Sequence, residues 1–159
     1  TTFLNIGIHK DSPEANLQFQ NIVQLQWPNH YHLFTDASKL SQNGPVGAAV
    51  WIPKFKISLK YKLPQTSSVY SGEAVALLEA ALFIKTRGLS KSVIFSDSLS
   101  CLQDITKFPS HSKVNFEIIL KIKETLFQCH CSGLDVTLVW IPSHSGICGN
   151  ELADSCAKE

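Results

Sequence analysis

Four acidic residues occupy places in this sequence where their carboxylates would lie close to buried structure. Asp36 and Asp97 each follow a short apolar run, HLFT and SVIFS, of the kind that forms a buried strand. Glu73 and Asp154 lie near the starts of two predicted helices. Burying an ionised carboxylate without a partner costs several kcal/mol, so either a basic side chain or a cation must meet these groups. Few basic residues lie near any of the four in the sequence, which favours a cation.

The segments around these acids predict strands and helices in the order β-β-β-α-β-α-α-β-α. The expected strands are residues 31–36, 46–52, 55–63, 92–96 and 136–141. The expected helices follow the capping residues 66–68, follow Ser98, span residues 115–128, and start near Asn150.

Short turns and alternating polarity decide how these strands should pair. The first three strands are joined by tight connections, which predicts an antiparallel meander. The fourth strand follows a helix, so it should run parallel to its neighbour through a right-handed crossover. We therefore expect an α/β fold with a five-stranded mixed sheet, three strands antiparallel and two parallel, and helices on both faces.

This topology would bring the four acids together. The first and fourth strands are expected neighbours, so Asp36 and Asp97 should emerge at the same edge, within reach of Glu73 and Asp154. Two carboxylates about 4 Å apart repel by roughly 4 kcal/mol at an effective dielectric of about 20, so the four would share a pocket only around divalent cations or when partly protonated. Oxygen-only ligands favour Mg²⁺ or Mn²⁺ over zinc, and a pair of such ions suits in-line displacement at phosphorus.

Several motifs resemble the ribonuclease H domain of reverse-transcribing elements, most of all that of non-LTR retrotransposons. The matching segments are TDAS around Asp36, SGEAVALLEA around Glu73, FSDSLS around Asp97, and WIPSHSGICGNELAD with His144 and Asp154. The last segment is the most specific, and the resemblance covers residues 31–159 in the same order. It implies the RNase H-like fold and cleavage of the RNA strand of an RNA–DNA hybrid, which leaves 3′-hydroxyl and 5′-phosphate ends.

The resemblance also implies roles for single residues. The four acids would bind two Mg²⁺ ions, for which Mn²⁺ would substitute, and Asp36 would bridge both ions. His144, in a loop beside the site, would assist proton transfer or product departure. Ser38 and Asn150 would touch the substrate by position.

Composition sets the wider context. The chain has 159 residues, is 44% apolar and has a net charge of +1, so it can bury a core but shows no strong footprint for a polyanion. An odd set of five scattered cysteines does not fit a disulfide framework, which predicts reduced thiols and a cytoplasmic or nuclear location. No apolar run approaches a membrane span. With no Met and a start at Thr1, the chain is expected to come from a longer open reading frame. The resemblance implies that this is a retroelement polyprotein, with its reverse transcriptase domain as partner.

Two parts of the chain do not follow the ribonuclease H pattern. Residues 1–30 show no chemistry and are expected to be an N-terminal extension or linker. The link at residues 108–115 holds one lysine where cellular relatives carry a basic helix and loop, so hybrid binding should be weak and salt-sensitive.

Two other functions compete with the ribonuclease. One is a catalytically inactive scaffold of the same fold that binds nucleic acid. The other is a different two-metal nuclease of this fold, such as an integrase, a transposase or a Holliday-junction nuclease. The glutamate of the first long helix and the SHSGICGNELAD segment favour ribonuclease H.

Overall fold

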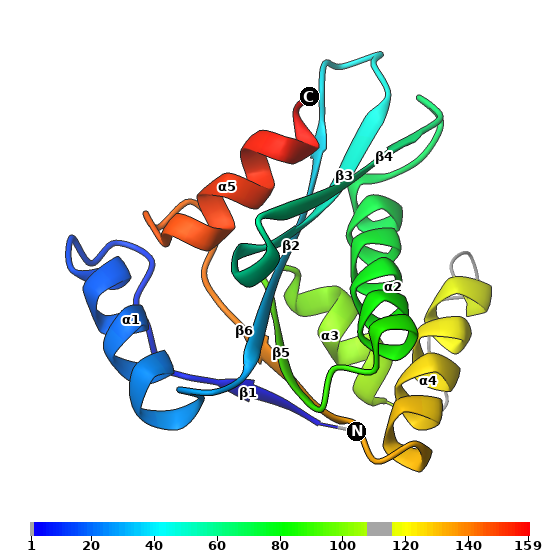
Figure 1. The fold of residues 1–159 in the computed structure, drawn as a ribbon. Helices are drawn as coiled ribbons and strands as arrows, with labels where there is room; N and C mark the ends of the chain where they lie inside the picture. The colour runs from blue at the N-terminus through cyan, green and yellow to red at the C-terminus, as the bar shows by residue number, and fades with distance from the viewer. Residues whose placement is uncertain (1, 108–115) are drawn as a thin grey trace.

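Six strands form one mixed sheet in the order β1-β6-β5-β2-β3-β4, with helices on both faces (Figure 1). The computed structural model describes residues 2–107 and 116–159. The strands are β1 (Phe3–Asn5), β2 (Tyr31–Lys39), β3 (Val46–Ile52), β4 (Ile57–Leu63), β5 (Lys91–Ser96) and β6 (Asp135–Trp140). The helices are α1 (Ala15–Gln26), α2 (Val69–Arg87), α3 (Leu99–Thr106), α4 (Phe116–Cys131) and α5 (Cys148–Ala157), with a 3-10 turn at Pro53–Phe55.

The pairing of the strands confirms the predicted topology, with one addition. Strands β2, β3 and β4 form the antiparallel meander, and β5 runs parallel to both β2 and β6. The sheet has six strands rather than the five expected, because β1 pairs in parallel with the outer edge of β6. Three residues of β1, of which Leu4 and Asn5 are exposed, carry too short a pattern to predict a strand.

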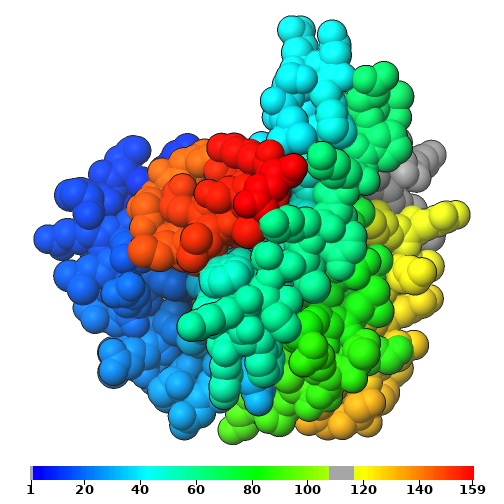
Figure 2. Space-filling model, turned by 45° about the horizontal axis from the view of Figure 1, so that its top comes forward, coloured from blue at the N-terminus to red at the C-terminus, as the bar shows by residue number. Residues whose placement is uncertain are grey.

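Each face of the sheet has its own apolar cluster. Helices α2, α3 and α4 cover one face, where Leu33, Ile94 and Leu77 are fully buried. Helices α1 and α5 lie on the other face, where Phe19 of α1 packs against Phe34 and Phe95 with ring centroids 5.8 and 4.9 Å away. Figure 2 shows α1 in blue beside α5 in orange and red. Residues 3–26, expected to form an extension, thus contribute a strand and a helix to the sheet and its core.

Strand β2 is longer than predicted, and the difference concerns Asp36. The strand was expected to end at Asp36, but it continues to Lys39. Its parallel ladder with β5 stops at Thr35, opposite Ser96, whereas its antiparallel ladder with β3 continues to Lys39. Asp36 therefore lies at the point where β5 leaves the sheet, rather than at the end of its own strand.

Helix α2 is capped as the sequence predicts. The Ser68 hydroxyl accepts a hydrogen bond from the Ser71 N–H at 3.1 Å, and Gly88 ends the helix in the left-handed conformation with φ of 63°. Because the helix begins at Val69, Glu73 lies just after the first turn rather than within it.

Two further expectations concern the whole chain. Among residues 2–107 and 116–159, no helix is both long and apolar enough to cross a membrane. The link at residues 108–115, on which the expectation of weak hybrid binding rests, lies outside the described residues.

Candidate metal centre

Asp36 and Glu73 are brought together by the close approach of α2 to the sheet. A Cβ at Gly72 would lie 2.8 Å from Cβ of Ala37 and 2.6 Å from Cγ1 of Val46, so only a glycine lets the helix approach β2 and β3 this closely. Asp36 is 4% exposed and Glu73 7% exposed. One oxygen of Asp36, Oδ1, accepts a hydrogen bond from the Ala37 N–H at 2.9 Å.

Asp97 follows β5 and completes a group of three acids. Carboxylate oxygens of Asp36, Glu73 and Asp97 all lie within 4.8 Å of one another. Beside the group, Asn150 of α5 is 2% exposed, and its side chain is hydrogen-bonded to Asp97. Oδ1 of Asn150 has no partner among the described residues. The side-chain nitrogen, Nδ2, is therefore the atom that donates to the Asp97 carboxylate.

Asp154 reaches the same pocket from α5, which is fixed to the sheet at two glycines. A Cβ at Gly47 of β3 would lie 1.8 Å from the carbonyl oxygen of Ala157, and one at Gly149 would lie 2.3 Å from the ring of Phe34. These contacts hold both ends of α5 against the sheet. Asp154, between them, is 9% exposed.

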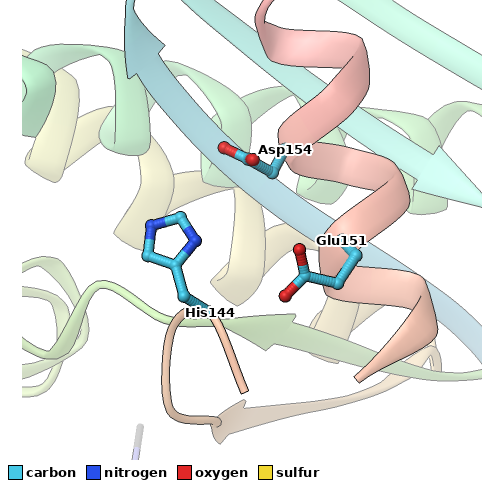
Figure 3. Close-up of side chains that lie close together, drawn as sticks. All are labelled: His144, Glu151 and Asp154. Atoms are coloured by element: carbon cyan, nitrogen blue, oxygen red, sulfur yellow. The ribbon is translucent and has the colours of Figure 1, made fainter. Parts of the chain in front are cut away.

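His144 approaches Asp154 from the loop before α5. Figure 3 shows the side chains of His144, Glu151 and Asp154 turned toward one another. Ligand atoms of the three lie within 4.8 Å. Glu151 Oε1 also accepts a hydrogen bond from the Gly146 N–H at 3.3 Å, which ties the loop to the helix. His144 itself has a left-handed backbone with φ of 50°, a conformation uncommon outside glycine.

Burial and mutual repulsion favour protonation of the acids when no cation is present. Burial, and then the negative charge of Asp97, raises the pKa of Asp36 to about 8. The same two causes raise the pKa of Glu73 well above its ordinary range. Burial also raises the pKa of Asp97, although the Asn150 hydrogen bond and the nearby His144 oppose the shift.

The residues present fit a divalent cation. Oε2 of Glu73 is buried and has no hydrogen-bond partner among the described residues. The ion pairs of residues 2–107 and 116–159 join Lys60 to Glu159 and Lys158 to Asp154, so neither neutralises the group of three acids. Crowded carboxylates with an orphaned oxygen form a hard oxygen donor set, which suits Mg²⁺ or Mn²⁺.

The pocket around the acids is open and has a volume of about 410 Å³. All four acids line it, together with His144 and Ser38. Asn150 is buried and is not among the residues that line the pocket.

Sequence reasoning missed Lys158 and Glu151. Lys158 lines the pocket, and its Nζ lies 2.8 Å from Oδ2 of Asp154. The spacing of Asp154 and Lys158, four residues apart on one helix, was a signal that could have identified the pair. The role of Glu151 depends on the path of the loop at Gly146, which the sequence pattern does not specify.

The chain is similar to known proteins over most of its length. The protein-family model for RNase H matches residues 28–159. Human ribonuclease H1 is 28% identical over 116 residues, and mouse ribonuclease H1 is 27% identical over 121 residues. Each match covers 69% of this chain but 41% of the relative, so the chain spans less than half the length of these proteins. The crystal structure of RNase H1 from Halobacterium salinarum NRC-1 has a TM-score of 0.61 at 18% identity, covers 82% of this chain and 96% of that one, and shows a shared fold.

Proposed function

The chain belongs to the RNase H family, and we propose that it hydrolyses the RNA strand of RNA–DNA hybrids, leaving 3′-hydroxyl and 5′-phosphate ends. The observation that carries this proposal is the convergence of Asp36, Glu73 and Asp97 within 4.8 Å at a pocket that Asp154 also lines. Four acids from four separate parts of the chain do not meet at one place for the stability of the fold, because their repulsion opposes it. Their convergence is useful when cations and a phosphodiester occupy the pocket.

Asp36, Glu73, Asp97 and Asp154 would hold two Mg²⁺ ions, with Mn²⁺ as a substitute. When bound, Mg²⁺ supplies activation of water and stabilisation of the charge on the leaving oxygen. Oε2 of Glu73, buried and without a hydrogen-bond partner among the described residues, would gain one in a bound ion.

Other residues of the pocket would position groups and move protons. The side chain of Asn150 would help to hold the Asp97 carboxylate in place through its hydrogen bond. Ser38, half-buried at the edge of the pocket, would contact the substrate, and the same role was expected of Asn150. The imidazole of His144 would hold or pass a proton near the leaving group, or assist departure of the product.

The biological setting is part of the same proposal. The SHSGICGNELAD segment supports an origin in a non-LTR retroelement polyprotein, with the reverse transcriptase domain of that polyprotein as partner. All five cysteines are free thiols, which supports a reducing cytoplasmic or nuclear setting. The catalytic domain would span residues 31–159, and residues 1–30 would be an extension that also completes the sheet through β1.

The test is cleavage of a labelled RNA–DNA hybrid in Mg²⁺, beside an Asp97→Asn variant as the matched control. Single-stranded RNA and duplex DNA serve as competing substrates. The expected result is cleavage of the RNA strand of the hybrid alone, abolished by Asp97→Asn. Hybrid binding without cleavage in Mg²⁺ or Mn²⁺ would instead support the inactive scaffold. Cleavage of duplex DNA would support another nuclease of this fold.

A further inference from the structure

A second cavity adjoins the metal centre, on the side of β6. It has a volume of about 530 Å³. Two of the residues that line it, Asp97 and Ser143, also line the pocket around the acids, so the two hollows meet there. The rest of its wall comes from Trp140 and Pro142, at the end of β6 and just after it, and from the segment of residues 5–10. We call it the β6-side cavity.

The N-terminal wall of this cavity is held in place by several contacts. Asn5 lies opposite Trp140 in the parallel ladder of β1 with β6 (Figure 1). Gly7 then turns the chain: its φ is 76°, and its N–H donates a hydrogen bond to Oδ1 of Asn5 at 3.0 Å. Ile8 is 5% exposed and belongs to the apolar cluster beneath α1. These contacts bring the residues that follow, Lys10 among them, to the cavity.

Lys10 supplies a positive charge to the β6-side cavity. It is exposed, and the ion pairs of the described residues involve Lys60 and Lys158 but not Lys10. Asp11, the next residue, is not among those that line the cavity. A lysine in this position, next to a site for a phosphodiester, can neutralise another phosphate of the same strand. Because Lys10 precedes residue 28, this charge lies outside the RNase H family match.

The wall on the β6 side supplies an aromatic ring. Trp140, the last residue of β6, is half-buried, and Pro142 beside it is buried. Aromatic side chains stack on the bases of single strands, and grooves that bind such strands combine these rings with positive charge. The β6-side cavity thus offers one group for the phosphate of a nucleotide and another for its sugar or base.

We propose that the β6-side cavity binds the nucleotide next to the scissile phosphate on the RNA strand, with Lys10 at its phosphate and Trp140 against its sugar or base. This inference rests on the proposed function, in which the scissile phosphate of the RNA lies at the acids. The next nucleotide of that strand is covalently attached to it, so it must occupy a hollow that adjoins them. Residues 5–10 would then contribute to substrate binding as well as to the fold.

The test is fluorescence anisotropy with a labelled RNA–DNA hybrid, in Ca²⁺ to prevent cleavage, over a range of salt concentrations. Lys10→Gln should weaken binding about fivefold at about 50 mM salt and reduce the slope of log K against log salt by about one, as expected for the loss of one phosphate contact. Lys91→Gln is the matched control. Lys91 is exposed and begins β5, at the opposite end of that strand from Asp97, so the affinity and the slope should be unchanged.

A second hybrid identifies the strand that Lys10 contacts. Its DNA strand carries uncharged methylphosphonate linkages, and Lys10→Gln should weaken its binding by the same factor. Trp140→Leu should weaken binding of the first hybrid without changing the salt slope, because the lost contact is uncharged. Trp140→Phe, which keeps a ring, should restore much of the affinity.

Three outcomes would overturn the proposal: equal effects of Lys10→Gln and Lys91→Gln, loss of the Lys10→Gln effect with the uncharged DNA strand, or no binding of the hybrid at any salt concentration. Cleavage in Mg²⁺ keeps this proposal distinct from the proposed function. If the unsubstituted chain cleaves the hybrid while Lys10→Gln binds it equally well, the proposed function stands and the subsite fails. If binding depends on Lys10 but no RNA is cut, the subsite stands and the proposed cleavage fails.

Discussion

At the scale of single residues, the metal centre holds acids in two different electrostatic settings. Asp36, Glu73 and Asp97 form a group with no lysine or arginine ion pair among the described residues. Asp154 is different, because it already has a cationic partner in Lys158. The first three acids therefore depend on protons or cations for neutralisation, whereas Asp154 would exchange Lys158 for the ion at the proposed metal site.

The raised pKa of Asp36 predicts how the stability of the metal-free protein varies with pH. The folded protein holds the proton up to a pKa of about 8, against an ordinary value of 3.8. Folding therefore takes up a proton between these values, so this contribution to stability is fully present below about pH 4 and is lost as the pH rises through 8.

The measurement is denaturant unfolding in EDTA at pH 5 and pH 8. The free energy of unfolding should fall over this range by no more than about 1.4 kcal/mol per pH unit for each proton released. The fall should be smaller in Asp36→Asn, and saturating Mg²⁺ should stabilise the unsubstituted chain more at pH 8 than at pH 5. Parallel pH curves for the two proteins would contradict the raised pKa.

His144 is expected to act on the reaction more than on ion binding. His144→Ala should lower kcat for hybrid cleavage by about 100-fold, at the low end of what general acid–base catalysis contributes. The affinity for Mg²⁺, measured by calorimetry without hybrid, should change little, because the group of three acids is intact. His130→Ala, at an exposed position in the last turn of α4, serves as the control. An unchanged kcat would remove His144 from the mechanism.

If Asp154 binds a cation as proposed, Lys158 would compete with that cation for its carboxylate. Its Nζ lies 2.8 Å from the carboxylate, at the spacing of four residues along α5. Lys158→Met should therefore strengthen Mg²⁺ binding in the absence of hybrid, by about twofold, since pairs at this helical spacing are weak. Lys62→Met, at an exposed position on β4, should leave the calorimetric titration unchanged. Weaker Mg²⁺ binding in Lys158→Met would show that the lysine supports the site instead.

At the scale of elements, the contact of α5 with β3 determines where Asp154 lies. Gly47→Ala would place a Cβ 1.8 Å from the Ala157 carbonyl oxygen, so the helix must move away from the sheet. We expect a loss of about 1–3 kcal/mol in the free energy of unfolding, the usual cost of overpacking. Because Asp154 moves with the helix, Mg²⁺ affinity should fall as well.

A substitution at a second glycine distinguishes a general loss of stability from a loss of Mg²⁺ affinity caused by movement of α5. At Gly133 a Cβ would meet open space, but the φ of 77° is unfavourable for alanine. Gly133→Ala should therefore destabilise the fold by about 1–2 kcal/mol and leave Mg²⁺ binding intact. Equal loss of Mg²⁺ affinity in both variants would show that general destabilisation, and not the position of α5, governs the site.

Some of the elements and their pairing could be predicted from the sequence, and others could not. The apolar runs before Asp36 and Asp97 identified two buried strands, and a strand–helix–strand order made those strands parallel neighbours, as the structure confirms. The continuation of β2 to Lys39 could not be predicted in this way, because it depends on backbone pairing with β3 and not on side-chain pattern. The contact of Asn150 with Asp97 likewise depends on how α5 is seated against the sheet.

At the scale of the whole molecule, the net positive charge available to bind a nucleic acid is small. The net charge is +1, from 14 basic and 13 acidic residues. Lys158, the lysine that lines the pocket around the acids among the described residues, is paired with Asp154. Lys60, on the outer strand β4, is paired with Glu159. The lysine that lines this pocket is thus already paired, and the net charge is close to zero, so the proposed reverse transcriptase partner would supply part of the affinity for the hybrid.

Hybrid binding by this chain alone should therefore be weak and rest on few phosphate contacts. With about two to four contacts, raising the salt from about 50 to 200 mM should weaken binding by roughly 10- to 100-fold, whereas proteins with six to ten contacts lose 10³–10⁵-fold. Fluorescence anisotropy with a labelled hybrid, in Ca²⁺ to prevent cleavage, gives the slope of log K against log salt. A relative that carries a basic loop is the reference. Equal affinities of the two proteins at moderate salt would contradict the expectation and show that the described lysines, or the link at residues 108–115, hold the hybrid unaided.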